Sequence, residues 1–261
     1  MRALLAAVAA LLVAACAPAD PSPPTPSAPT SLKADVLETL PHDPKAFTQG
    51  LEIDDGVLYE GTGLEGESSM RATDPDTGQV EKSTRLPADM FGEGITVVGD
   101  TIWQLTWQDG VAIKRDRRTL AERGRASYAG EGWGLCHDGK RLIMSDGTDR
   151  LTFRDPATFD ETGHTDVTDA DGRPIDQLNE LECVDGDVYA NVWRTDRIVR
   201  IDPETGKVTA TVDLTGLLPA EDRAGTDVLN GIASIPGTDE FLVTGKLWPA
   251  MFRVRFVTDG D

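Results

Sequence analysis

The sequence has few residues suited to metal or nucleic-acid chemistry. Its three histidines, His42, His137 and His164, match no metal-ligand spacing, so a zinc site is not expected. Lysine and arginine together number 25 against 45 aspartates and glutamates, which gives a net charge of −20. Because binding to phosphate backbones depends on clustered basic residues, this composition argues against a nucleic-acid partner. The acidic excess is typical of a solvated surface that keeps a protein in solution.

The sequence also lacks an apolar run long enough to span a membrane. The longest run, 3–13, follows Arg2 and is shorter than the about 20 residues of a membrane helix. Such a run, ending in small residues, is typical of a signal peptide, so residues 1–15 are predicted to be removed on export. Cys16 then resembles the lipidated cysteine of bacterial lipoproteins; the alternative is an ordinary signal with an incidental cysteine. We expect an exported protein whose only membrane contact is a lipid anchor, on the periplasmic or cell-surface side.

A proline-rich segment follows the predicted anchor. Residues 17–31 contain no large apolar side chain and are dominated by proline, serine and threonine. A segment of this composition cannot bury a core and is predicted to be a semi-extended tether. The sequence therefore predicts a lipidated cysteine and tether over 16–31 and a folded domain over 32–261.

Long amphipathic helical patterns are missing as well, and a strand pattern takes their place. Short β-prone runs alternate with Asp-Gly and Gly-Asp turns, which is typical of an all-β fold. Five repeats open a strand with a leading residue, usually followed by glycine and then by leucine or isoleucine. The leading residues are Gln49, Glu93, Trp133, Asn179 and Asn230. Their intervals of 44, 40, 46 and 51 residues match four-stranded propeller blades.

The two ends of the repeat region complement each other. The fifth repeat runs out after Val254 without an outer strand, whereas residues 33–40, before the first repeat, alternate as a strand does. Closing the ring with strand 33–40 would leave only short, protected strand edges. The sequence thus predicts a five-bladed β-propeller closed by an N-terminal strand that completes the last blade.

Two cysteines remain within the repeats. Cys136 and Cys183 fall near the same register of neighbouring repeats. In an exported protein they can form a disulfide, and two buried free thiols are the alternative.

The repeat places polar and aromatic residues at one mouth of the predicted channel. The chain returns opposite each leading residue about fourteen residues later, or sixteen in the fifth repeat. The returning residues are Gly63, Trp107, Gly147, Trp193 and Lys246. Buried donors and acceptors are costly unless paired, so this ring fits a small polar ligand between aromatic walls. The alternative is a set of groups that hold ordered water and tie blades together. The glycines beside Glu93 are expected to leave room for substrate and for close strand approach.

Motifs in every repeat carry a resemblance to a known family. They are residues 47–51, 62–64, 68–71, 91–96, 104–107, 131–135, 145–148, 178–182, 191–193, 229–232 and 244–246. Over about 45–256 the chain resembles the plant and bacterial type of glutaminyl-peptide cyclotransferase. The resemblance implies a five-bladed propeller enzyme without catalytic zinc. It also implies conversion of the N-terminal glutaminyl residue of peptides or proteins to pyroglutamyl, with release of ammonia.

The resemblance also assigns active-site roles to nine positions. They are Phe47, Gln49, Phe91, Glu93, Trp107, Trp133, Asn179, Trp193 and Lys246. Glu93 is predicted to move the proton, Lys246 and Asn179 to stabilise the oxyanion, and Gln49 to orient the reacting groups. The three tryptophans, with Phe47 and Phe91, would hold the substrate side chain. No cofactor is required, a structural channel cation such as calcium stays open, and we expect a monomer.

Two other functions remain open on the sequence alone. Glu93, Asn179 and Asn230 are also oxygen ligands, as in a metal-dependent propeller lactonase or esterase. The same channel mouth also suits a non-catalytic lipoprotein that binds peptides.

Overall fold

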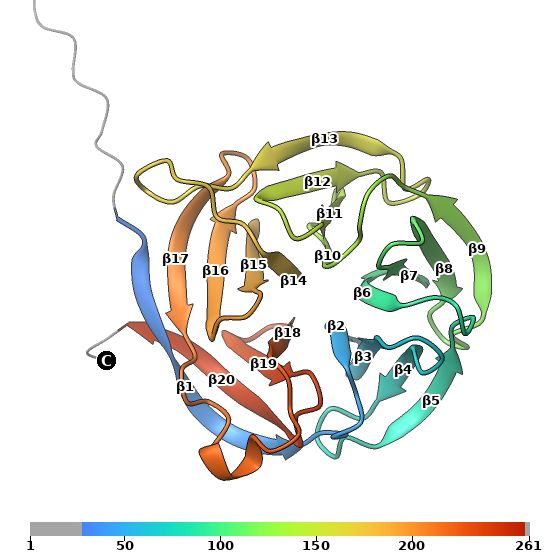
Figure 1. Cartoon of the computed structure of the whole chain (residues 1–261), viewed down its shortest axis with the longest axis horizontal. Coiled ribbons are helices and arrows are strands. Elements are labelled where there is room, and N and C mark those ends of the chain that lie inside the picture. Colours follow the sequence, from blue (N-terminus) through green and yellow to red (C-terminus); the bar gives the residue numbers. More distant parts are fainter. Residues whose placement is uncertain (1–27, 259–261) are drawn as a thin grey trace, which may run out of the picture.

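The computed structural model describes residues 28–258. The predicted signal peptide, Cys16 and most of the predicted tether lie outside these residues. Within them, twenty β-strands surround a central axis as a ring, and the one helical segment is the 3-10 turn η1 (Ala220–Asp222) (Figure 1). No helix in this part of the chain has the length and apolar character that a membrane crossing requires. The predicted all-β class is confirmed.

Three four-stranded antiparallel sheets follow one another in the ring. Their strands run in chain order from the axis outward (Figure 1). The first sheet contains β2 (Thr48–Asp54), β3 (Val57–Thr62), β4 (Ser69–Thr73) and β5 (Val80–Arg85); the second contains β6 (Gly92–Val98), β7 (Thr101–Thr106), β8 (Val111–Asp116) and β9 (Glu122–Ser127); the third contains β10 (Leu135–His137), β11 (Leu142–Ser145), β12 (Arg150–Arg154) and β13 (Glu161–Asp166).

The remaining strands form one eight-stranded sheet. In spatial order they are β14 (Leu178–Val184), β15 (Asp187–Val192), β16 (Arg197–Asp202), β17 (Lys207–Asp213), β1 (Thr30–Pro41), β20 (Ala250–Thr258), β19 (Glu240–Gly245) and β18 (Leu229–Ser234). β1 pairs antiparallel with β20, which confirms the predicted strand 33–40 as the partner of the last strand. Its pairing begins at Thr30, ahead of the predicted domain boundary at Leu32. β1 also pairs in parallel with β17, which the sequence did not predict.

Turn chemistry separates these strands. The glycines predicted in the inner hairpin turns all have positive φ: Gly56, Gly99, Gly139, Gly186 and Gly237. Between β4 and β5, the Asp74 carboxylate accepts hydrogen bonds from the Asp76 and Thr77 amides and the Thr77 hydroxyl. Such local bonds fix a turn before any tertiary contact forms.

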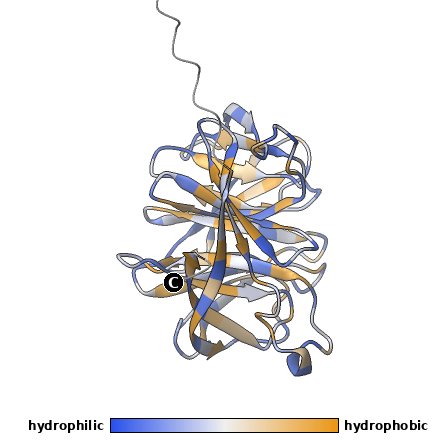
Figure 2. Ribbon diagram, turned by 90° about the vertical axis from the view of Figure 1, so that its left-hand side faces the viewer, coloured by the Kyte–Doolittle hydropathy of each residue, from blue (hydrophilic) through white to orange (hydrophobic). Residues whose placement is uncertain are grey.

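Apolar side chains pack between neighbouring sheets. Tyr59 and Met70 of the first sheet lie in one buried cluster with Ile95 and Ile102 of the second. The ring viewed from its side shows hydrophobic and hydrophilic segments interspersed along the strands (Figure 2). This pattern follows from strand geometry, because successive side chains point to opposite faces of a sheet.

The glycines that follow Gln49, Glu93 and Trp133 allow the innermost strands to approach closely. A Cβ atom on Gly94 would lie 2.5 Å from the carbonyl oxygen of Trp133, and one on Gly134 would lie 2.0 Å from that of Asn179. On the other side of Glu93, a Cβ atom on Gly92 would lie 2.7 Å from the Thr62 carbonyl oxygen. Neighbouring backbone thus fills the space beside these glycines. The expectation that they leave room for substrate was wrong.

A disulfide joins two of the innermost strands. Cys136 of β10 and Cys183 of β14 are bonded, with their Cα atoms 5.5 Å apart. The structure therefore has the bridged form of the two alternatives, and the bond ties the third sheet to the eight-stranded sheet.

Candidate active site

One cavity at the ring axis contains all nine residues that the resemblance assigns. It has a volume of about 330 Å³, and Arg194, Asp227 and Val228 also line it. The nine residues come from hairpins spread along the whole chain, so the ring closure brings them together.

Bulges direct three of the leading side chains. The strand register shifts between Thr48 and Gly50, and likewise around Glu93 on β6 and Asn179 on β14. A bulge leaves one residue out of the ladder and re-aims its side chain. Gln49, Glu93 and Asn179 each occupy such a position and line the cavity. Asn230 occupies a fourth register shift, between Leu229 and Ile232, without lining the cavity, so the bulge alone does not decide which side chain reaches it.

Glu93 and Gln49 form the polar centre of the cavity. The Gln49 Nε2 donates a hydrogen bond of 3.0 Å to Glu93 Oε1. Both side chains are almost fully buried, at 3% and 5% relative exposure for Gln49 and Glu93. Burial raises the pKa of Glu93 well above its usual range, the positive charge of Lys246 opposes this shift, and the negative charge of Glu131 adds to it. Glu93 is therefore a carboxyl group that binds a proton readily.

Lys246 faces the same centre from the turn after β19. Burial lowers its pKa, while the carboxylates of Glu93 and Asp227 oppose that shift. Its Nζ lies 4.9 Å from the centre of the Phe47 ring. This ring face offers the ammonium a favourable electrostatic contact. Lys246 thus presents its ammonium group inside a cavity walled by aromatic rings.

Asn179 adds an unpaired amide. The side chain is 2% exposed, and its Oδ1 has no hydrogen-bond partner within residues 28–258. A buried polar atom without a partner is costly and rare in folded proteins. At the edge of a cavity, such an atom is available to a bound ligand.

Aromatic rings form the walls. Trp133 and Trp193 meet edge to face with ring centres 5.4 Å apart. Phe91 makes similar contacts with Trp107 at 5.8 Å and with Phe47 at 6.1 Å. The edge-to-face arrangement is the preferred one for such pairs and makes the walls stiff.

Glu131 fixes two of these rings and was not predicted as a site residue. Its Oε2 accepts the indole N–H of Trp107 at 2.8 Å and of Trp133 at 2.9 Å. Partial burial alone would raise the pKa of Glu131. Hydrogen bonds from Gln108, Trp133 and Trp107 outweigh this effect, so the pKa lies below its usual range. The carboxylate is therefore charged and holds both indoles in place. Its place two positions before Trp133 does not predict this role, because Trp107 comes from another hairpin.

Two of the returning residues are glycines because aromatic rings occupy the space beside them. A Cβ atom on Gly63 would lie 2.4 Å from the Phe91 ring, and one on Gly147 would lie 2.6 Å from the Trp133 ring. The glycines therefore serve the aromatic walls and supply no chemistry themselves.

Asn230 is not among the residues that line the cavity, but it contacts one of them, because its Nδ2 donates a hydrogen bond of 3.4 Å to Gln49 Oε1. It is fully buried, and its Nδ2 donates a hydrogen bond of 3.0 Å to the Thr48 carbonyl oxygen. This bond ties β18 to β2. Asn230 thus joins two innermost strands and supports Gln49 from behind.

The described residues contain no obvious metal site. No group of three or more His, Cys, Asp or Glu side chains within residues 28–258 is arranged to hold a metal ion. His42 bonds instead to the Trp248 carbonyl oxygen and to Glu60.

The buried carboxylates on the innermost strands bind backbone amides. Both oxygens of Glu180 accept amide N–H groups, those of Leu51 and Ile232. Glu52 likewise accepts the Val97 amide, at 2.8 Å. These carboxylates therefore tie the innermost strands to one another through their backbone amides.

Three comparisons with known proteins agree with this geometry. Residues 5–256 match the family model described as glutamine cyclotransferase. The chain is 40% identical over 227 residues to glutaminyl-peptide cyclotransferase of Arabidopsis thaliana, covering 85% of this chain and 70% of that protein. It also superposes on the crystal structure of Myxococcus xanthus glutaminyl cyclase with a TM-score of 0.81 and 36% identity, covering 88% of this chain and 99% of the other. The chain belongs to the glutamine cyclotransferase family.

Proposed function

We propose that this protein cyclises the N-terminal glutaminyl residue of peptides or proteins to pyroglutamyl and releases ammonia. The observation that carries the proposal is the buried Glu93 carboxyl, with a raised pKa and a hydrogen bond to Gln49, inside an aromatic cavity of about 330 Å³. The family and the two named relatives support the same activity.

The reaction forms one bond and breaks one at the same carbon. The α-amine nitrogen of the substrate attacks the side-chain amide carbon, and the bond from that carbon to the amide nitrogen breaks. Glu93 accepts the proton that the amine loses and returns it to the departing nitrogen, which leaves as ammonia. A raised pKa suits this role, because the group must both take and give a proton near neutral pH.

The Lys246 ammonium and the Asn179 Nδ2 group donate to the oxyanion that develops on the amide oxygen, whereas the unpaired Asn179 Oδ1 accepts an N–H of the substrate. One well-placed donor in such a site contributes about 2.7–4 kcal/mol to the transition state. Gln49 orients the amine or the amide by hydrogen bonding while it holds the Glu93 carboxyl.

The aromatic walls hold the substrate side chain in its folded conformer. Trp107, Trp133 and Trp193, with Phe47 and Phe91, surround the space in which the glutamine side chain bends back on its own amine. The flexible side chain then loses its conformational entropy when it binds, so this loss no longer adds to the activation barrier.

The ring is a five-bladed propeller. The support is the strand order, in which β2–β5, β6–β9, β10–β13 and β14–β17 each form one group of four, and β1 adds a fourth strand to β18–β20. The shared edge of β17 and β1 then joins the last two blades into the eight-stranded sheet.

The proposal extends to cofactor, assembly and location. The enzyme works as a monomer without a metal ion. It is exported, and a lipid on Cys16 anchors it through the tether on the periplasmic or cell-surface side of a bacterial membrane.

Mass spectrometry of a glutamine-initiated peptide tests the activity. Incubation with the enzyme should convert the peptide to its pyroglutamyl form with loss of ammonia, equally with and without a chelator. Ester hydrolysis that a chelator abolishes, without ammonia release, would instead support the lactonase. Saturable peptide binding without any product would support the binding protein.

A further inference from the structure

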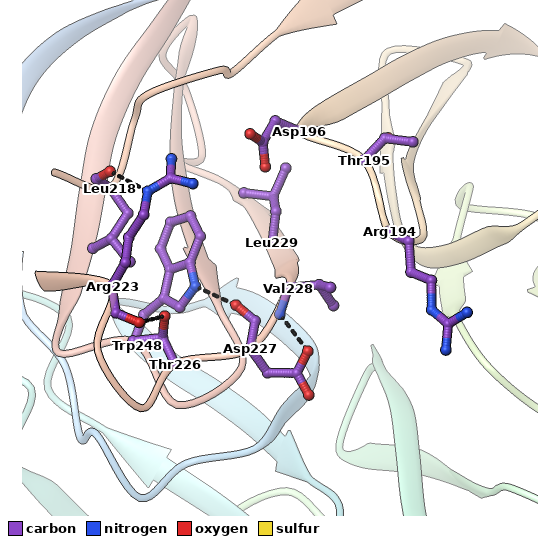
Figure 3. Close-up of a pocket in the computed structure, with 10 residues that line it drawn as sticks. All are labelled: Arg194, Thr195, Asp196, Leu218, Arg223, Thr226, Asp227, Val228, Leu229 and Trp248. Atoms are coloured by element: carbon purple, nitrogen blue, oxygen red, sulfur yellow. Dashed lines mark hydrogen bonds between the residues drawn. The ribbon is translucent and has the colours of Figure 1, made fainter. Parts of the chain in front are cut away.

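A second hollow opens beside the active-site cavity. This side groove is bounded by residues 194–196 and 218–229 and by Trp248, and its volume is about 360 Å³ (Figure 3). Arg194, Asp227 and Val228 line both the side groove and the active-site cavity. The two hollows are therefore neighbours that share these three residues as a common wall.

Arg194 stands at this boundary with a free positive charge. Its guanidinium lies 4.1 Å from the ring centre of Trp193, which is itself a wall of the active-site cavity. Many other arginines pair with carboxylates, as Arg71 does with Asp43, whereas Arg194 is in none of the ion pairs found among residues 28–258. Stacking on an indole limits the movement of the guanidinium and leaves its edge available for a planar partner.

The rest of the side groove has both kinds of hydrogen-bonding groups. Arg223 lies on the opposite side from Arg194, and Asp196 and Asp227 lie between them (Figure 3). Arg223 is held by a bond from its Nε to the Leu218 carbonyl oxygen, and Asp227 accepts the Val228 amide. A lining that mixes donors and acceptors matches a peptide backbone, which presents both, better than it matches a simple ion.

We propose that the side groove binds the residues that follow the N-terminal glutamine, and that Arg194 binds a carboxylate at the second position. The inference rests on the proposed function, because a glutamine side chain placed at Glu93 must let the rest of its chain leave the cavity. The boundary at Arg194 and Asp227 is the exit that leads into a second hollow. The carboxylate is either an acidic second side chain or the free α-carboxylate of a dipeptide, because a guanidinium fork binds both in the same way.

Two substrate series separate the two sources of carboxylate. One series contains C-terminally amidated tetrapeptides with glutamine first and glutamate, glutamine or lysine second. The other compares the dipeptide Gln-Ala with its amide. A hydrogen-bonded charge pair of this kind corresponds to a preference of about tenfold in kcat/KM for the carboxylate over its neutral or basic counterpart. A preference in either series supports the proposal and names the source.

Variants show whether Arg194 causes the preference. R194Q should bring the ratio of kcat/KM between the glutamate and lysine peptides close to one. The matched control is R197Q, which removes the same charge from an exposed residue of β16 that lines neither hollow. It should keep the wild-type ratio. T226W, which fills the side groove, should raise KM for tetrapeptides more than for glutamine amide.

The outcomes are distinct. An unchanged ratio in R194Q, an equal change in R197Q, or equal KM changes for short and long substrates in T226W would overturn the subsite while cyclisation itself continued. Failure of the wild-type enzyme to release ammonia from any of these substrates would overturn the proposed function and this inference with it.

Discussion

Glu131 offers a sharp test of how the aromatic walls contribute to turnover. The variant E131A removes the acceptor of two indole hydrogen bonds, at 2.8 Å and 2.9 Å. A hydrogen bond to a charged group is worth about 1.5–3 kcal/mol, and partial exposure of Trp107 and Glu131 reduces this to about 1 kcal/mol each. Loss of both bonds should therefore lower kcat/KM by about 2 kcal/mol, or roughly 30-fold.

The same residue also acts on Glu93 through its charge. The carboxylate of Glu131 helps to raise the pKa of Glu93, so its removal should lower that pKa. E131Q keeps an acceptor oxygen beside the indoles but loses the charge. The acidic limb of the kcat/KM profile should consequently move to lower pH in both variants, whereas the large loss of rate should occur in E131A alone.

Steady-state kinetics from pH 4 to pH 9 on a glutamine-initiated peptide would measure both effects. E81Q is a suitable control, because it removes one charge from the exposed outer strand β5. An E131A enzyme with wild-type kcat/KM would refute the idea that this carboxylate holds the walls. An acidic limb that stays in place in both variants would refute its electrostatic effect on Glu93.

Four further changes have expected outcomes. E93Q should lower kcat by about 10²–10⁴ while KM changes little, and a near-normal rate would remove Glu93 from proton transfer. K246A should cost about 2.7–4 kcal/mol in kcat/KM; unchanged kinetics would exclude an oxyanion role. Replacing Cys136 and Cys183 by serine opens a loop with a sequence separation of 47, so urea unfolding should show a loss of about 4 kcal/mol, and equal stability would contradict this chain-entropy argument. Burial raises the pKa of Glu52 to about 8 from 4.5, so wild-type stability should fall as pH rises between these values; E52Q should weaken that fall, and identical pH dependence would refute the assignment.

The active-site residues could be predicted from the sequence where the repeat fixes geometry. Gln49, Glu93 and Asn179 stand six or seven residues before a turn glycine, so hairpin geometry places them at about one level of the channel. Trp107 is predicted from the return of the hairpin that begins at Glu93, and Lys246 from the return of the hairpin that begins at Asn230. The repeat does not predict that Asn230 stays out of the cavity lining. Strand spacing gives the height of a residue along the channel, but it does not show that the Asn230 amide bonds to Thr48 and Gln49.

Other features depend on contacts that no repeat encodes. Arg194 and Asp227 belong to loops, whose lengths differ between repeats, and Glu131 became evident only once both indoles lay beside it. The parallel pairing of β1 with β17 could not be predicted either. It requires the last two strand groups to lie side by side, which follows from closure of the ring and not from local sequence.

The position of β1 constrains the order in which the chain can fold. Leu32 pairs with Thr258, so β1 can complete its antiparallel pairing only after β20 has been synthesised. Contacts of such large sequence separation form slowly, because a long loop must close before they contribute. During synthesis the first three sheets can form as local meanders, whereas β1 has neither neighbour until β17 and β20 are made. Shortening the chain by its final strand should therefore leave an open ring with an exposed seam, a species prone to pair with other chains.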